Sequence, residues 1–106
     1  MQNTVISECG YFEWDPIKNE NNKKKHGFTF DEILEIFEDP FLLTRFDTKN
    51  STISEERYFT LGSIQGILII AVSHTDRNGR TRIISARQAE PKLKKVYNEH
   101  IEKINS

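Results

Sequence analysis

The segment from His74 to Arg87 carries the residues best suited to chemistry in this sequence. Its fourteen residues include a histidine and four arginines, Arg77, Arg80, Arg82 and Arg87. A guanidinium group is planar and donates two parallel hydrogen bonds, so it binds phosphate or carboxylate groups in a fixed geometry. The segment therefore predicts a site for an anionic partner, with nucleic-acid phosphate as the favoured anion.

The arginines of this segment are not expected to act as one stripe. Side chains along a strand alternate between its two faces, so Arg82 and Arg87 are expected on opposite faces unless a bulge intervenes. Each is flanked by buried residues, which predicts a specific role, either functional or in a buried ion pair. Arg77 and Arg80, at the tip of the predicted hairpin, are expected to be solvated or paired with acidic residues, with phosphate binding as the alternative.

Proton transfer at a bound phosphate needs an acid or a base, and three places in the sequence offer one. Glu56 precedes Arg57 and is a candidate general base, or else half of an ordinary cross-strand ion pair. His74 ends a long apolar run and titrates in the useful pH range, although a lone histidine is more often structural. Lys25 and His26 form a second candidate pair at a helix end, where the alternative is compensation of the helix dipole.

The composition is that of a globular chain with a heavily charged surface. Of 106 residues, 36% are hydrophobic and 29% are charged, and the length suits one domain. There is no apolar run of about 18 residues, so no membrane span is expected. Cys9 is the only cysteine and no Cys/His set has zinc spacing. We therefore expect a cytoplasmic protein with no metal and no cofactor.

Charge is divided unevenly along the chain. The net charge is −1, yet residues 1–56 carry six Lys and Arg against twelve Asp and Glu, and residues 57–106 carry nine against four. Such asymmetry is a cue for contact with nucleic acid. The alternative is that the two halves neutralise each other in the fold.

Two helices are expected in the first half. Asp15 at the N-cap, with Pro16 after it, begins the first helix, and Gly27 is a plausible residue to end it. Thr29 and Glu32 form a capping box that predicts a second helix, which ends at the Asp-Pro pair of residues 39 and 40. Its buried stripe is expected to comprise Phe30, Ile33, Leu34 and Phe37.

Strands dominate the rest of the chain. After a leading strand at residues 11–14, the expected strands are 41–46, 57–61, 67–74 and 82–87. Their short connections predict an antiparallel meander, and Pro91 begins a last helix with an apolar face. The predicted fold is therefore α+β, a small antiparallel β-meander packed with two N-terminal helices and one C-terminal helix.

Several short motifs occur together in a recognisable order. F-E-W-D stands at residues 12–15, K-H-G-x-x-F at 25–30 and R-I-I-S-A-R at 82–87, with F-E-D-P at 37–40 and Glu56-Arg57 between them. In this order and spacing the chain resembles the BrnT family from about residue 11 to residue 99. Residues 1–10 precede the family pattern and are expected to be an extension of a single domain of residues 1–106.

The resemblance implies a fold, an activity and a set of partners. BrnT proteins are toxins of type II toxin–antitoxin systems with a RelE-like ribonuclease fold. The implied activity is metal-independent endoribonuclease cleavage of RNA, in which the ribose 2′-hydroxyl attacks the adjacent phosphate. The implied partner is a BrnA-type ribbon–helix–helix antitoxin, and operator DNA is reached only through that antitoxin.

The resemblance also gives the candidate residues roles. Glu56 or His74 would supply the base or the acid, and Arg57, Arg82 and Arg87 would stabilise charge on the phosphate. The predicted RNA-binding residues are Lys25, His26, Arg77 and Arg80. The competing hypothesis is a module without catalysis that binds its antitoxin and acts as a co-repressor.

Overall fold

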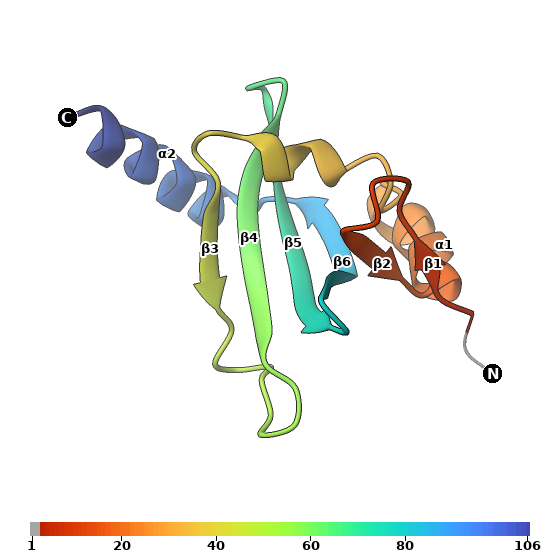
Figure 1. Cartoon of the computed structure of the whole chain (residues 1–106). Coiled ribbons are helices and arrows are strands. Elements are labelled where there is room, and N and C mark those ends of the chain that lie inside the picture. The colour runs from red at the N-terminus through yellow and green to blue at the C-terminus, as the bar shows by residue number, and fades with distance from the viewer. Residues whose placement is uncertain (1–2) are drawn as a thin grey trace.

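One six-stranded sheet organises the protein, in the order β1-β2-β6-β5-β4-β3 (Figure 1). The computed structural model describes residues 3–106. The strands are β1 (Val5–Ile6), β2 (Phe12–Trp14), β3 (Leu43–Phe46), β4 (Arg57–Ile64), β5 (Leu68–Arg77) and β6 (Arg80–Gln88). The helices are α1 (Pro16–His26), the 3₁₀ helix η1 (Leu34–Glu38) and α2 (Pro91–Asn105). The predicted α+β class is confirmed.

The sheet is mixed, so the predicted antiparallel meander is wrong as a description of it. Strands β3 to β6 do pair antiparallel in chain order. Strand β2, however, pairs parallel with β6, with Glu13 beside Arg82, and β1 pairs antiparallel with β2. The leading strand thus covers an edge of the meander that would otherwise expose unpaired backbone groups.

The predicted second helix is also wrong, because only the five residues of η1 are helical between α1 and β3. The capping box does form, with the hydroxyl of Thr29 donating to Glu32 and the Glu32 N–H donating back. The fully buried residues after it are Phe30, Ile33 and Ile36, each three positions from the last. A spacing of three matches a 3₁₀ turn rather than an α-helix. The packing of these three side chains therefore favours the tighter helix.

Close packing of η1 on the sheet depends on a glycine in β4. A Cβ added to Gly62 would lie 2.9 Å from the Cβ of Ile36, a distance that real Cβ contacts almost never show. The lack of a side chain at Gly62 lets η1 approach the sheet. This places Phe37 against the strands that carry the candidate residues.

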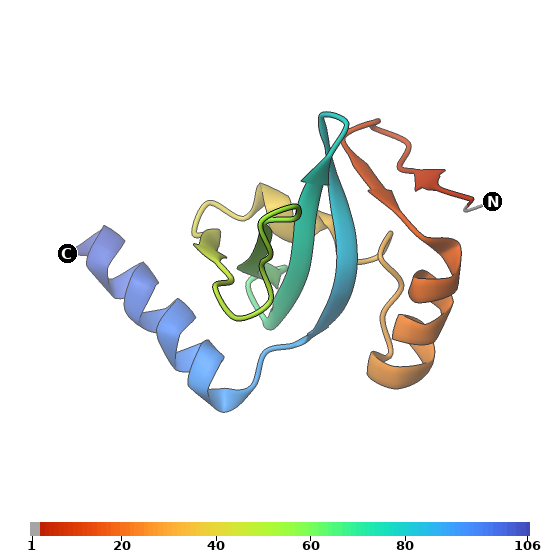
Figure 2. The same ribbon diagram turned by 90° about the horizontal axis from the view of Figure 1, so that it is seen from below.

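The two faces of the sheet are buried by different elements. On one face, called the η1 face here, Ile70 and Val72 of β5 join a core with Trp14, Phe30 and Ile36. On the other, called the α2 face, the core contains Leu61, Ala89 and Tyr97, with Leu93, Val96 and Ile101 of α2 packed against it. Helix α1 lies along the outer edge of β6, at the other end of the sheet from α2 (Figure 2). Neither α1 nor α2 is long and apolar enough to cross a membrane.

Candidate functional site

A β-bulge in β6 decides which way the arginines point. His74 of β5 pairs with Ile83 and Ser73 pairs with Ser85, which leaves Ile84 without a partner across the ladder. Thr75 pairs with Arg82, and Ala71 pairs with Arg87. Thr75 and Ala71 are four residues apart on a regular strand, so they share a face, and so do the arginines opposite them. The prediction that Arg82 and Arg87 face opposite ways is therefore wrong, because the bulge brings both onto the α2 face.

Arg82 lies in a buried ion pair. Its Nη1 is 2.5 Å from Oε2 of Glu13, and the two residues are only 8% and 4% exposed. The same nitrogen also donates to the hydroxyl of Thr4 at 3.4 Å. This pair joins β2 to β6 across their parallel ladder. Of the two roles left open for Arg82, the structure shows the buried ion pair.

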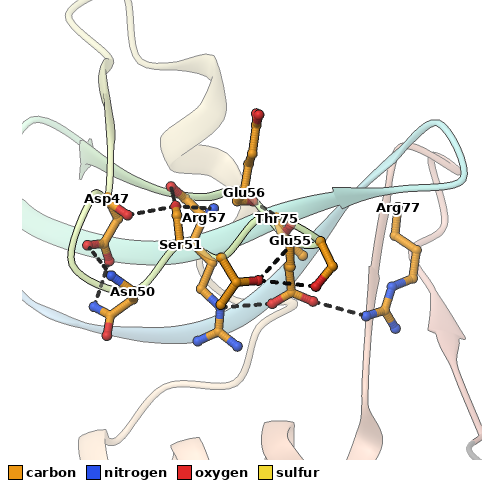
Figure 3. Close-up of polar contacts among 10 residues, drawn as sticks. Asp47, Asn50, Ser51, Glu55, Glu56, Arg57, Thr75 and Arg77 are labelled. Carbon is orange, nitrogen blue, oxygen red and sulfur yellow. Dashed lines mark hydrogen bonds and ion pairs between the residues drawn. The ribbon is translucent and has the colours of Figure 1, made fainter.

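Arg57 lies on the same face at the start of β4, opposite Thr75. Its Nε donates to Oε1 of Glu55 at 2.8 Å, while Oε2 of Glu55 accepts from Arg77 at 3.4 Å. Figure 3 shows the two arginines reaching Glu55 from either side. The hydrogen bond from Arg57 is the main reason that the pKa of Glu55 is lowered. Glu55 is therefore held as a carboxylate, which makes it a weak base.

Glu56 is turned away from these arginines. In Figure 3 its side chain projects to the opposite side of the strand from Arg57 and Glu55. The hydroxyl of Tyr58 donates to Oε2 of Glu56 at 2.8 Å, and this bond raises the pKa of Tyr58. The carboxylate beside Arg57 is thus Glu55. Strand alternation alone could have indicated this, since residues two apart share a face.

His74 also lies away from the arginines, on the η1 face. It is 7% exposed, and its ring stacks on Tyr58 with centroids 5.9 Å apart. Phe37 contacts the ring edge-on, and Nε2 hydrogen-bonds to the hydroxyl of Thr60 at 2.7 Å. Burial lowers the pKa of His74, although Asp76 opposes the shift. The histidine is therefore a buried neutral ring whose surroundings are mainly aromatic.

The remaining basic candidates come together on the α2 face, around Ser85. Two shallow hollows meet at this residue, one of about 260 Å³ towards α2 and one of about 200 Å³ towards α1. The first contains Ser73 and Arg87, with Asp47 as its one carboxylate, and the second contains Lys25 and His26. We call this surface the basic groove, defined by Lys18, Lys25, His26, Ser73, Ser85 and Arg87. The sequence analysis assigned no role to Lys18, Ser73 or Ser85.

The electrostatics of the basic groove favour a neutral histidine beside a weakly paired cation. The pKa of His26 is lowered first by burial, then by the charges of Lys25 and Arg87. Arg87 forms an ion pair with Glu90 at 3.2 Å, but both side chains are about half exposed. Exposed pairs of this kind contribute less than about 1 kcal/mol. An incoming phosphate could therefore take Glu90's place on Arg87.

Helix α1 is fixed beside the groove by a buried asparagine. The side-chain amide of Asn22 donates to the carbonyl of Ala86 at 2.8 Å and accepts from the Ala86 N–H at 3.0 Å. It thereby pairs with the edge of β6 as a neighbouring strand would. Asp15 caps the start of α1, and Gly27 ends it in the left-handed conformation at φ 84°, as expected. His26 is thus held next to Ser85 by contacts far apart in sequence.

Another hollow, larger than these two, is less suited to phosphate. It has a volume of about 530 Å³ and lies at the end of the β5–β6 hairpin, where Glu55, Glu56 and Asp76 face a single cation, Arg77. Three carboxylates would repel an anion more than one guanidinium attracts it. Arg80 does not change this, because its Nε donates to the backbone carbonyl of Gly10 at 3.0 Å. Among residues 3–106 no cluster of His, Cys, Asp and Glu is placed to hold a metal.

Comparison with known proteins found one family model and one solved structure that are similar to this chain. Residues 14–92 match the family model described as the ribonuclease toxin, BrnT, of type II toxin–antitoxin systems. Among solved structures, the 1.1 Å crystal structure of the Brucella abortus ribonuclease toxin, BrnT, is similar, with a TM-score of 0.55 and 29% sequence identity. The match covers 73% of this chain and 92% of the Brucella chain. No curated protein sequence matches the chain.

Proposed function

Because the chain belongs to the BrnT family of ribonuclease toxins of type II toxin–antitoxin systems, we propose that it cleaves RNA bound in the basic groove. The observation that supports this most is the convergence of His26, Lys25 and Arg87 around Ser85 from separate elements. The basic groove brings cations and an uncharged imidazole to one open surface. Cleavage of a phosphodiester needs both.

RNA would lie across the α2 face with its backbone near the arginines. Arg57 and Arg87 are two strands and four residues apart, which is roughly 16 Å between Cα atoms for ordinary strand geometry. Apart from the bond from Nε to Glu55, Arg57 makes no side-chain hydrogen bond with residues 3–106. Its terminal nitrogens are thus open to a second phosphate of the same strand. Lys25 and Lys18 would add attraction that depends on salt.

We assign the chemical step to His26 and Arg87. Neutral His26 accepts the proton of the ribose 2′-hydroxyl as the 2′-oxygen forms a bond to phosphorus. The bond from phosphorus to the 5′-oxygen then breaks, which leaves a 2′,3′-cyclic phosphate and a 5′-hydroxyl. Arg87 stabilises the charge on the phosphoryl oxygens, and water from the open groove supplies the proton for the leaving oxygen. No metal takes part in this proposed route.

The other candidate residues receive supporting roles in this proposal. Arg82 with Glu13 holds β2 against β6, and His74 fills the aromatic layer on the opposite face. Arg77 with Glu55 steadies the hairpin end. We further propose a RelE-like relationship for the fold and a cytoplasmic location. The partners would be a BrnA-type ribbon–helix–helix antitoxin and, only through it, operator DNA.

The decisive experiment is an RNA cleavage assay in excess EDTA. Purified protein is incubated with a labelled single-stranded RNA, and the ends of the products are identified. We expect cleavage that leaves 2′,3′-cyclic phosphates. A strict need for a divalent metal would reject the 2′-hydroxyl route but not the nuclease, whereas no cleavage at any concentration would favour the co-repressor hypothesis.

A further inference from the structure

The η1 face carries a second hollow whose chemistry differs from that of the basic groove. It lies between η1 and the turn that joins β1 to β2 and has a volume of about 480 Å³. Its apolar lining includes Tyr11, Phe12, Leu34 and Phe37, and the rings of Phe12 and Phe37 are 4.8 Å apart. Tyr11 is 73% exposed, so most of its ring is presented to solvent at the edge of the hollow. Exposed aromatic residues beside an apolar hollow are typical of protein interfaces.

Acidic residues border this hollow. Glu35 and Glu38 line it, and the same two side chains also line a neighbouring hollow of about 320 Å³ that includes Asp39 and Phe41. None of the residues that line either hollow is a lysine or an arginine. We call the combined surface the acidic groove, defined by Tyr11, Phe12, Leu34, Glu35, Phe37 and Glu38. Its charge would repel RNA and attract a cationic partner.

We infer that the acidic groove binds the antitoxin, through a segment with apolar side chains flanked by lysines or arginines. The apolar side chains would enter the hollow between Tyr11 and Phe37, and the cations would meet Glu35 and Glu38. This inference rests on the proposed function, which supplies the antitoxin as the partner. Charge complementarity favours this occupant over nucleic acid.

The position of the acidic groove determines which surface of the toxin the antitoxin would cover. The groove lies on the η1 side of the sheet, whereas Arg87 and Ser85 lie on the α2 face. A segment anchored at Tyr11 and Glu38 would therefore leave the basic groove uncovered. Inhibition would then need a second part of the antitoxin that reaches around the sheet.

The test is a binding titration of the purified toxin with the antitoxin encoded beside it. Two toxin variants alter the acidic groove, Tyr11→Ser and the double variant Glu35→Lys with Glu38→Lys. Matched controls make the same kinds of change elsewhere on exposed side chains, Ile53→Ser and the double variant Glu99→Lys with Glu102→Lys. All six changed side chains are exposed, so each variant should retain the urea unfolding midpoint of the parent.

We expect each groove variant to weaken antitoxin binding by about tenfold or more, and the controls to change it by less than about twofold. Binding of the parent should also weaken as NaCl is raised, and the double groove variant should lose much of that dependence. Unchanged affinity of both groove variants would overturn the inference and leave the nuclease proposal intact. If the parent toxin did not bind the antitoxin at all, the inference and the proposed partner would both fail, while the RNA assay would still report on cleavage.

Discussion

The arginines of the α2 face differ in how firmly the fold holds them. Arg82 is buried against Glu13, whereas Arg87 is paired only with the exposed Glu90. Replacing Arg82 would leave Glu13 as a buried carboxylate without its partner, which is strongly destabilising. An Arg82 variant could therefore lose activity because it unfolds, so such a loss would not show that Arg82 takes part in the chemical step. Arg87 is the better residue for a test of function.

Arg87→Gln should lower the rate of RNA cleavage by roughly 10²–10³-fold, because it removes the charge that stabilises the phosphoryl oxygens. The matched control is Arg77→Gln, which removes an arginine from the hairpin end. We expect its cleavage rate to stay within about threefold of the parent, since an exposed ion pair contributes little. Single-turnover rates with excess enzyme would separate this effect from RNA affinity. An equal loss in both variants would place the RNA at the hairpin end instead.

His26 should impose a rising limb on the pH profile of kcat/KM. The base is active only when it is neutral, so activity should increase with pH and level off above the pKa of His26. Because burial, Lys25 and Arg87 lower that pKa, the midpoint should lie below the usual value of about 6.5. Lys25→Gln removes one of these causes, so the midpoint should move upward.

The control for this profile is Lys24→Gln, because Lys24 is a neighbouring exposed lysine that pairs with Glu20. It should leave the midpoint unchanged. His26→Ala should abolish the limb along with most of the activity. A limb that persists in His26→Ala would show that another group accepts the proton.

At the scale of elements, Asn22 connects α1 to the sheet. Asn22→Ala would leave the N–H and carbonyl of Ala86 without their partners in a buried place. Each buried polar group left unpaired costs about 1–3 kcal/mol, so we expect a loss of roughly 2–4 kcal/mol in the free energy of unfolding. Urea denaturation measures this, with Asn21→Ala on the exposed side of α1 as the control. A loss below about 0.5 kcal/mol would mean that α1 is held by other contacts.

The elements also show which features the sequence could and could not predict. The start of α1 at Asp15 and its end at Gly27 both arise from local chemistry, and both are present. The second helix was wrong because its capping box specifies only one turn. The conformation of the chain after that turn is decided by the fit of Ile36 against Gly62, which is a contact between distant segments. Helix propensity depends on the local sequence alone, so it cannot predict such a contact.

For the site, the residue types were easier to predict than their directions. Arginines, a carboxylate and a histidine were expected near one another, but Glu56 and His74 point to the η1 face. The alternation of side chains along a strand could have indicated Glu55, rather than Glu56, as the carboxylate beside Arg57. The shared direction of the Arg82 and Arg87 side chains could not be predicted, because no residue type in the sequence marks the bulge. The role of Asn22 was equally hidden, since it depends on a partner 64 residues away.

At the scale of the whole molecule, the uneven charge of the sequence becomes two surfaces. Glu35 and Glu38, from the acidic first half, border the acidic groove, while Arg87 of the basic second half lies in the basic groove. The first half also contributes Lys25 and His26 to the basic groove. The halves therefore do not simply neutralise each other. The fold separates a surface suited to RNA from one suited to a cationic protein.

The attachment of α2 to the rest of the molecule should make stability depend on acid pH. Asp39 accepts hydrogen bonds from the Tyr97 hydroxyl and from Ser63. Burial alone would raise the pKa of Asp39, but these bonds and one from the Phe41 N–H outweigh it, so the pKa is lowered. A lowered carboxyl pKa gives stability that is complete above the unfolded value of about 4 and is lost as pH falls through the folded value.

We therefore expect the free energy of unfolding to decrease as pH falls below about 4, and Asp39→Asn to show a smaller decrease over that range. Urea titrations at a series of pH values measure the slope. Asp31→Asn is the control, because Asp31 is exposed, and its slope should match that of the parent. If Asp39→Asn kept the full slope, the acid sensitivity would have to come from other carboxylates such as Glu55.

Ile84, which has no partner across the ladder, changes which positions of β6 face α2. Upstream of it, even-numbered positions such as Arg82 face α2, and downstream of it odd-numbered positions such as Ser85 and Arg87 do so. Without this extra residue, Arg82 and Arg87 would stand four positions apart in a regular strand and would still share the α2 face. Ala86 would likewise keep its core position, and Ser85 its place in the basic groove. A strand of the present length without the bulge would instead turn one of the two arginines to the opposite face. The bulge therefore compensates for one extra residue in the chain, and deletion of Ile84 should preserve the direction of Arg87.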